Sequence, residues 1–109
     1  MILTDETKLD FERWLHSNDV LIKEGIYDDT YLTDVFDKLP LNLRYALIIE
    51  WFDSVGIYVN SSGLTLSKAF ISDVSVDNNC EYNYDGFRTR KEALIEAIKK
   101  ANEIYNEKK

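Results

Sequence analysis

The sequence predicts an α+β fold, in which N-terminal helices are followed by a three-stranded antiparallel sheet and a C-terminal helix packed on it. The first observation is a change of period: apolar residues recur about every 3.6 positions before Gly56 and alternate after it. The second is a capping box, Thr89 with Glu92 three residues later, which opens a final helix. We therefore expect a mainly helical half, 1–56, and a half with the sheet and the closing helix, 57–109.

The helical half is predicted from three apolar stripes. A first helix begins at Thr4, with acids in its first turn where the helix dipole favours them, and ends near Ser17. Residues 30–39 form a short helix that Pro40 ends. Asn42 caps the third helix. Its stripe consists of Leu43, Leu47, Ile48, Trp51, Phe52 and Val55, and Gly56 follows its end.

The second half is predicted from alternation and turn residues. Residues 57–59 form a strand and residues 61–63 a turn, after which Leu64 and Leu66 alternate with polar residues. A strand over 70–76 then turns at residues 77–79. The returning strand pairs antiparallel with it and carries three residues on one face: Cys80, Tyr82 and Tyr84.

The closing helix is predicted to lie across one face of this sheet. Its Thr89 hydroxyl accepts a hydrogen bond from a helix amide, while Glu92 reaches back to the Thr89 amide. Its apolar stripe consists of Leu94, Ile95, Ile98, Ala101, Ile104 and Tyr105. Glu96 and Lys100 form an i, i+4 pair on its outer side.

Length and composition predict a single α+β domain over residues 1–109, with one core. The start of the chain has no basic flank followed by an apolar run, and no apolar stretch approaches the ~20 residues that span a membrane. Cys80 is the only cysteine, which excludes an internal disulfide and favours a reducing compartment. We therefore expect a cytoplasmic protein that does not bind membranes.

The net charge of −7 is concentrated in the first half of the chain. Residues 1–56 hold 12 acids and 5 bases, whereas residues 57–109 hold 8 of each. An acidic surface repels phosphate, which argues against direct nucleic-acid binding and favours a protein partner with a basic surface. The residues predicted to bind that partner are Asp5, Glu6, Asp10, Glu12, Asp28, Asp29, Asp34 and Asp37. The alternative is that these acids form a solvated surface that only keeps the domain soluble.

Few residues are available for catalysis or metal binding. His16 and Cys80 are the only imidazole and the only thiol, and a structural zinc site needs four such ligands. The acids at 77–81 resemble the start of a calcium loop, but Tyr82 and Arg88 stand where that loop needs Gly and Glu. We therefore expect no enzyme activity, no metal ion and no cofactor.

Two further groups of charged residues have open interpretations. Glu50 and Asp53 lie one turn apart on the most apolar helix, so either a raised pKa or an ordinary solvated face is possible. Three cations crowd the start of the last helix, where the dipole disfavours them: Arg88, Arg90 and Lys91. They either pair with nearby acids such as Asp85 and Glu92 or contact an anion or an acidic partner.

Residues 41–105 resemble small uncharacterised proteins of phages and other mobile elements. The resemblance is carried by YALIIEWFDSVGIYVN, then a hairpin, then YDGFRTRKEALIEAIKKANEIY. It implies an inhibitor that occupies a basic surface of a nucleic-acid-handling host protein. The hairpin and final helix are also similar to HicB-type antitoxins, although the chain lacks their Gly-rich first strand and any DNA-binding appendage. This second similarity implies an antitoxin-like or regulatory subunit that binds a small protein.

Overall fold

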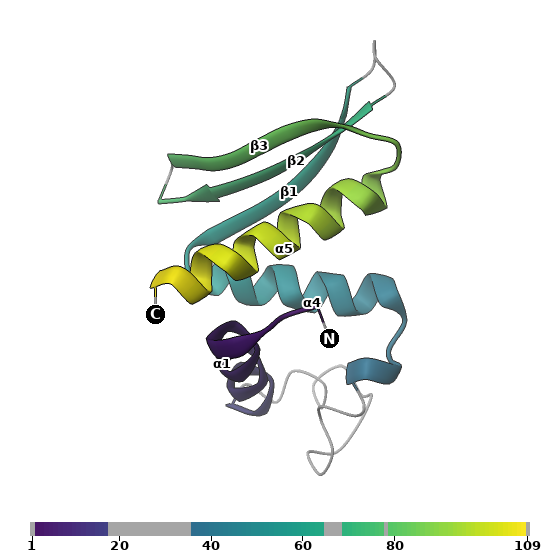
Figure 1. Ribbon diagram of the computed structural model, residues 1–109. Coiled ribbons are helices and arrows are strands. Elements are labelled where there is room, and N and C mark those ends of the chain that lie inside the picture. Colours follow the sequence, from purple (N-terminus) through teal and green to yellow (C-terminus); the bar gives the residue numbers. More distant parts are fainter. Residues whose placement is uncertain (1, 18–35, 65–68, 78, 109) are drawn as a thin grey trace.

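The computed structural model describes residues 2–17, 36–64, 69–77 and 79–108. In chain order its elements are α1 (Asp5–Ser17), α4 (Leu41–Ser54), β1 (Ile57–Leu64), β2 (Ala69–Val76), β3 (Asn79–Phe87) and α5 (Arg90–Lys108) (Figure 1). A helical turn at 36–38 precedes α4. The predicted α+β fold, with helices before a three-stranded antiparallel sheet and a final helix packed on it, is confirmed.

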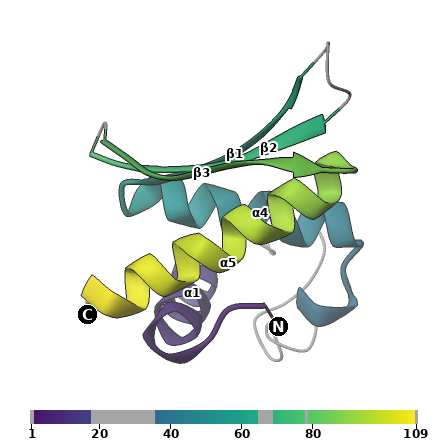
Figure 2. The same ribbon diagram turned by 45° about the horizontal axis from the view of Figure 1, so that its top comes forward.

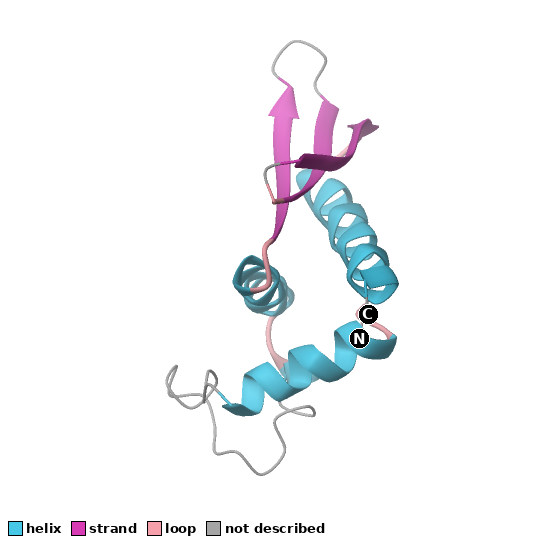
Figure 3. Ribbon diagram, turned by 90° about the vertical axis from the view of Figure 1, so that its left-hand side faces the viewer, coloured by secondary structure: helices cyan, strands magenta, loops and turns pink. Residues whose placement is uncertain are grey.

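The elements lie in layers, with the sheet on one side and the helices on the other. α4 and α5 pack beneath the same face of the sheet, and α1 packs against these two helices from beyond (Figures 1 and 2). Figure 3 shows the same arrangement from the side. Buried residues from all these layers form one hydrophobic cluster, so the helical half and the sheet half share a core. No described element covers the other face of the sheet (Figure 2).

The strand order is β1-β2-β3, and both neighbouring pairs are antiparallel. The turn predicted at 61–63 is wrong, because these residues continue β1 and pair with Ser72, Ile71 and Phe70. The alternation predicted around Leu66 lies outside the described residues.

The prediction that Cys80, Tyr82 and Tyr84 share one face of β3 is wrong for Cys80. Tyr82 lies opposite the buried Val74, but the register shifts before Cys80, which lies opposite Ser75. Residues directly opposite each other on paired strands share a face, and a bulge inserts one extra residue into one strand. Tyr82 therefore faces the helices, whereas Cys80 lies on the open face.

α4 begins one residue after Pro40 rather than after Asn42. The Pro40 carbonyl accepts hydrogen bonds from the amides of Leu43 and Arg44 at 3.0 and 3.1 Å, and no side chain caps the helix. The predicted Asn42 cap is therefore wrong, since Asn42 is the second residue of the helix. At the other end Gly56 has φ +82°, as expected of a glycine just past a helix.

The apolar stripe of α4 is shorter than predicted. Its buried residues are Leu47, Ile48, Trp51 and Phe52, and Leu43 is partly buried against the core. Val55, which the spacing placed in the stripe, is 40% exposed because it stands at the C-cap, where the helix gives way to the turn into β1.

α5 begins at the predicted cap. The Thr89 hydroxyl accepts a hydrogen bond from the Glu92 amide at 3.1 Å. Glu92 reaches back one residue further than predicted, and its carboxylate accepts from the Arg88 amide at 3.3 Å. The predicted Glu96–Lys100 pair is replaced by two i, i+3 pairs, Glu96 with Lys99 and Lys100 with Glu103, at 3.6 and 3.2 Å.

The buried face of α5 is made largely of small residues. Its buried positions are Ala93, Ala97, Ile98, Ala101 and Asn102. Leu94, Ile104 and Tyr105 are partly buried beside them. Alanines at intervals of four residues place little bulk between the helix and the strands, so the α5 backbone can approach β1 and β2 closely.

A polar network joins the start of α1 to the end of α5. The Asn102 side chain accepts a hydrogen bond from the Thr4 amide at 2.9 Å and donates one to the Thr4 hydroxyl at 3.0 Å. The buried Thr7 hydroxyl lies 3.2 Å from the Asn102 carbonyl and 2.7 Å from the Asn106 side-chain oxygen. Because each group is hydrogen-bonded, these polar residues can be buried between the helices without an unpaired donor.

Candidate functional site

The acids predicted to bind a partner are not equally available in the structure. Asp28, Asp29 and Asp34 lie outside the described residues. Asp5 and Glu6, in the first turn of α1, and Asp37, beside Phe36, are exposed. These last three can contribute to an outward negative surface.

Asp10 and Glu12 of α1 are turned toward the rest of the protein. The Asp10 carboxylate accepts a hydrogen bond from the Tyr105 hydroxyl at 2.6 Å and forms an ion pair with Arg13 at 3.0 Å. One carboxylate oxygen of Glu12 is buried without a hydrogen-bond partner. No local pattern in the sequence indicates the Tyr105 contact, because the two residues are 95 positions apart. Asp10 and Glu12 therefore contribute less negative charge to the outward surface than the sequence predicts.

The open face of the sheet is a broad polar surface that sequence reasoning did not single out. Three rows of cross-strand neighbours form it: Tyr58, Ser75 and Cys80; Asn60, Asp73 and Asn83; Ser62 and Ile71. Tyr58 is 50% exposed, although it is one of the largest side chains on the sheet. The Cys80 thiol lies 3.6 Å from a carboxylate oxygen of Asp73. This surface offers hydrogen-bonding groups and an aromatic side chain on a rigid support.

The described sheet carries acids and no bases. Asp73 lies on β2, Asp77 on the turn after it, and Glu81 and Asp85 on the edge strand β3. No Lys or Arg occurs among the described residues of the three strands. Seven of the eight bases of residues 57–109 fall at position 88 or later. The zero net charge of that half is therefore the sum of an acidic segment and a basic segment. Residues 57–87, with four acids and one base, have a net charge of −3, and residues 88–109, with four acids and seven bases, have a net charge of +3.

Within the described part of the chain, the three cations at the start of α5 form no ion pair with Asp85 or Glu92, which was one of the two interpretations left open for them. Arg90 lies over the Phe70 ring, with its guanidinium carbon 5.8 Å from the ring centroid. Arg88 and Lys91 are exposed and have no ion pair within the described part of the chain. The Arg90 contact is a cation–π interaction, which accounts for one cation of the three at this helix start.

Glu50 and Asp53 of α4 are the carboxylate pair for which a raised pKa was one of two open interpretations. Partial burial of Asp53 removes water from its carboxyl group and raises the pKa above its ordinary value near 3.8. Both Asp53 and Glu50 lie on the exposed side of the helix. The pair therefore lies outside the buried core.

The described ranges contain neither a metal-binding cluster nor a membrane-spanning helix. Within residues 2–17, 36–64, 69–77 and 79–108, no group of three or more His, Cys, Asp or Glu side chains could hold a metal ion. No helix in these ranges is both long enough and apolar enough to cross a membrane. Comparison with known proteins gives no assignment either: no family model, no curated protein and no solved structure matches this chain.

Proposed function

We propose that this protein is a non-enzymatic binding protein that uses the acidic outer surface of its sheet to occupy a basic surface of a partner protein. The observation that carries the proposal is the uncovered sheet face, whose strands hold Asp73, Glu81 and Asp85 but no described Lys or Arg. A surface with charges of one sign attracts a partner of the other sign and speeds their encounter.

The chemistry of the face supports protein binding beyond its charge. Half-exposed Tyr58 is the kind of side chain that is enriched at protein interfaces, because it adds apolar contact area with little loss of rotamer freedom. The rows around it supply hydroxyl and amide groups for hydrogen bonds. The sheet is held from behind by α4 and α5, so this surface is organised before a partner arrives.

The resemblance to mobile-element proteins suggests the class of protein to which the basic partner belongs. In this proposal the partner is a nucleic-acid-handling host protein, whose phosphate-binding groove supplies the basic surface, and the protein acts as its inhibitor. The second candidate is an antitoxin-like or regulatory subunit that binds a small protein. The uncovered face favours this candidate as well, since docking by a sheet face needs no basic groove. The identity of the partner separates the two.

Association kinetics test the proposal. The partner is isolated from cells of the source organism with the tagged protein and identified, and its association rate is measured at low and high salt. Reversal of the exposed β3 acids, Glu81→Lys with Asp85→Lys, should slow association about tenfold or more at low salt. The difference should shrink as salt is added, because the Debye length is ~8 Å at physiological ionic strength.

Two further charge-reversal variants serve as comparisons for the β3 variant. Glu103→Lys with Glu107→Lys reverses the same number of exposed charges on α5 and should change the rate little. Asp34→Lys with Asp37→Lys tests the N-terminal acids; slowing by this variant alone would move the contact to them and contradict the sheet assignment. Rates that respond neither to salt nor to any of the reversals would overturn the proposed function.

A further inference from the structure

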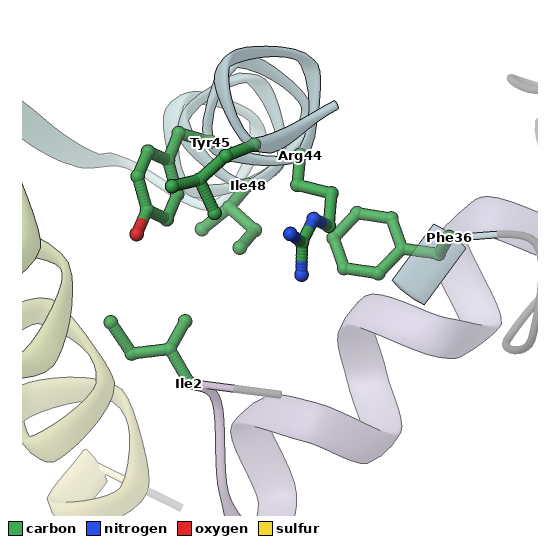
Figure 4. A pocket seen from close by; sticks show the side chains of 6 residues that line it. Ile2, Phe36, Arg44, Tyr45 and Ile48 are labelled. Carbon is green, nitrogen blue, oxygen red and sulfur yellow. The ribbon is translucent and has the colours of Figure 1, made fainter. Parts of the chain in front are cut away.

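A pocket lies on the helical side of the protein, beneath α4. The described residues that line it are Ile2, Phe36, Leu41, Arg44, Tyr45 and Ile48. Its volume is about 200 Å³, and it is partly open to solvent. Figure 4 shows that Arg44, Tyr45 and Ile48 project from α4, while Ile2 comes from the segment before α1. Four of the six side chains are hydrocarbon, so most of the wall is apolar.

Among the described residues that line the pocket, Arg44 is the only one with a charged side chain. Its guanidinium group points from α4 toward the space between Ile2 and Phe36 (Figure 4). The Nε atom is buried and has no hydrogen-bond partner. No acid among the described residues forms an ion pair with Arg44, and Glu12 is no exception although it also has a buried unpaired oxygen.

A guanidinium donor that is buried without an acceptor is unfavourable, because it has lost water and gained nothing in return. Arginine binds carboxylates well, since its planar group presents parallel N–H donors to the two oxygens. The structure thus has a cationic donor without an acceptor, directed into a cavity whose other walls are apolar. An acceptor supplied by a ligand would satisfy the donor.

We propose that this pocket binds a small carboxylate that carries one compact apolar group, with the carboxylate on Arg44 and the apolar group against Ile2, Leu41 and Ile48. The size fits: an engineered protein cavity of roughly 150 Å³ is enough to hold benzene. An inorganic anion would leave the apolar walls uncovered, and a neutral apolar ligand would leave the guanidinium unpaired. This site lies away from the sheet face and does not depend on the proposed function.

Phenylacetate is a suitable probe, with phenylacetamide as its uncharged counterpart and sulfate as an anion without the ring. Binding to the full chain is measured by titration with two-dimensional amide NMR, which also locates the site. We expect phenylacetate to shift the resonances of α4 and of the Ile2 segment at millimolar concentration, and to bind about tenfold more tightly than phenylacetamide or sulfate. Equal binding of phenylacetate and phenylacetamide, or no shifts around the pocket, would overturn the proposal.

A charge-removing variant supplies a second test. Arg44→Gln should weaken phenylacetate binding about tenfold and leave phenylacetamide binding nearly unchanged. Arg88→Gln removes an exposed cation that does not line the pocket and should leave both affinities unchanged. Unchanged phenylacetate affinity in a folded Arg44→Gln protein would contradict the assignment. If that variant does not fold, the comparison of the three probes on the unaltered protein still decides the matter.

Discussion

Replacing Phe11 with alanine should lower the free energy of unfolding by about 3–5 kcal/mol, among the largest losses expected from a single substitution in this protein. Phe11 is fully buried, and its ring lies 5.2 Å from the Phe36 ring, 5.8 Å from the Trp51 ring and 6.0 Å from the Trp14 ring, between centroids. It therefore joins α1 to α4 and to the turn at 36–38. Its removal leaves a cavity that three large rings cannot fill without moving.

Urea unfolding followed by far-UV circular dichroism measures this loss. Leu9→Ala is the matched control, since Leu9 lies on the same helix but is 47% exposed, and its loss should be within about 0.5 kcal/mol. Because small domains are stable by only about 5–15 kcal/mol, the Phe11 variant should also begin to unfold at much lower urea concentration. Similar losses for the two variants would mean that α1 does not pack as described.

The second large effect is expected at the contact of α5 with the sheet. Ile98 is fully buried in the core, so Ile98→Ala should cost about 2–5 kcal/mol. Thr89→Ala removes only the cap at the start of the same helix and should cost about 1 kcal/mol. Both values come from the same urea experiment. Losses that are equal and negligible would contradict the packing of α5 on the sheet.

The elements that could be predicted are those with local signals. The Thr89 cap and the glycine at 56 depend on residues within one turn of the chain, and both are in place. The switch from a period near 3.6 to a period of 2 depends on short stretches as well, and it predicted the change from helices to strands. Such signals suffice for the class of the fold and for the order of its elements.

The predictions that were wrong concern residues at which two structural signals compete, or whose partners are distant in the sequence. Asn42 is a favourable cap, but Pro40 fixes an extended backbone two residues earlier, and the helix begins there instead. Ser61 and Ser62 favour a turn, yet their pairing with β2 keeps them in a strand. The face of Cys80 depends on a bulge, which becomes visible only when the register with β2 is known.

The candidate site was less predictable than the fold. Asp10 was assigned to an outward surface because α1 was considered alone, whereas Tyr105 of α5 binds its carboxylate. The acids of the sheet were overlooked because the bases of α5 cancel them in the sum over the second half. Only the structure separates these charges, since it places the strands on one side of the core and α5 on the other.

In the proposed complex the partner covers the open face of the sheet, and Cys80 reports on that face without any added label site. It is the only cysteine of the chain, and it is exposed on β3 opposite Ser75. A comparison site on the other side of the molecule comes from Glu107→Cys in a Cys80→Ser background, because Glu107 is exposed near the end of α5.

The decisive measurement is the rate at which a maleimide reagent alkylates each thiol, with and without a saturating amount of the basic partner. We expect the partner to slow alkylation of Cys80 about tenfold or more, because a covered thiol reacts only in the fraction of protein that is unbound. We expect no change for the thiol at position 107. A Cys80 rate that the partner leaves unchanged, together with slowing at position 107, would place the interface on α5 and contradict binding through the sheet.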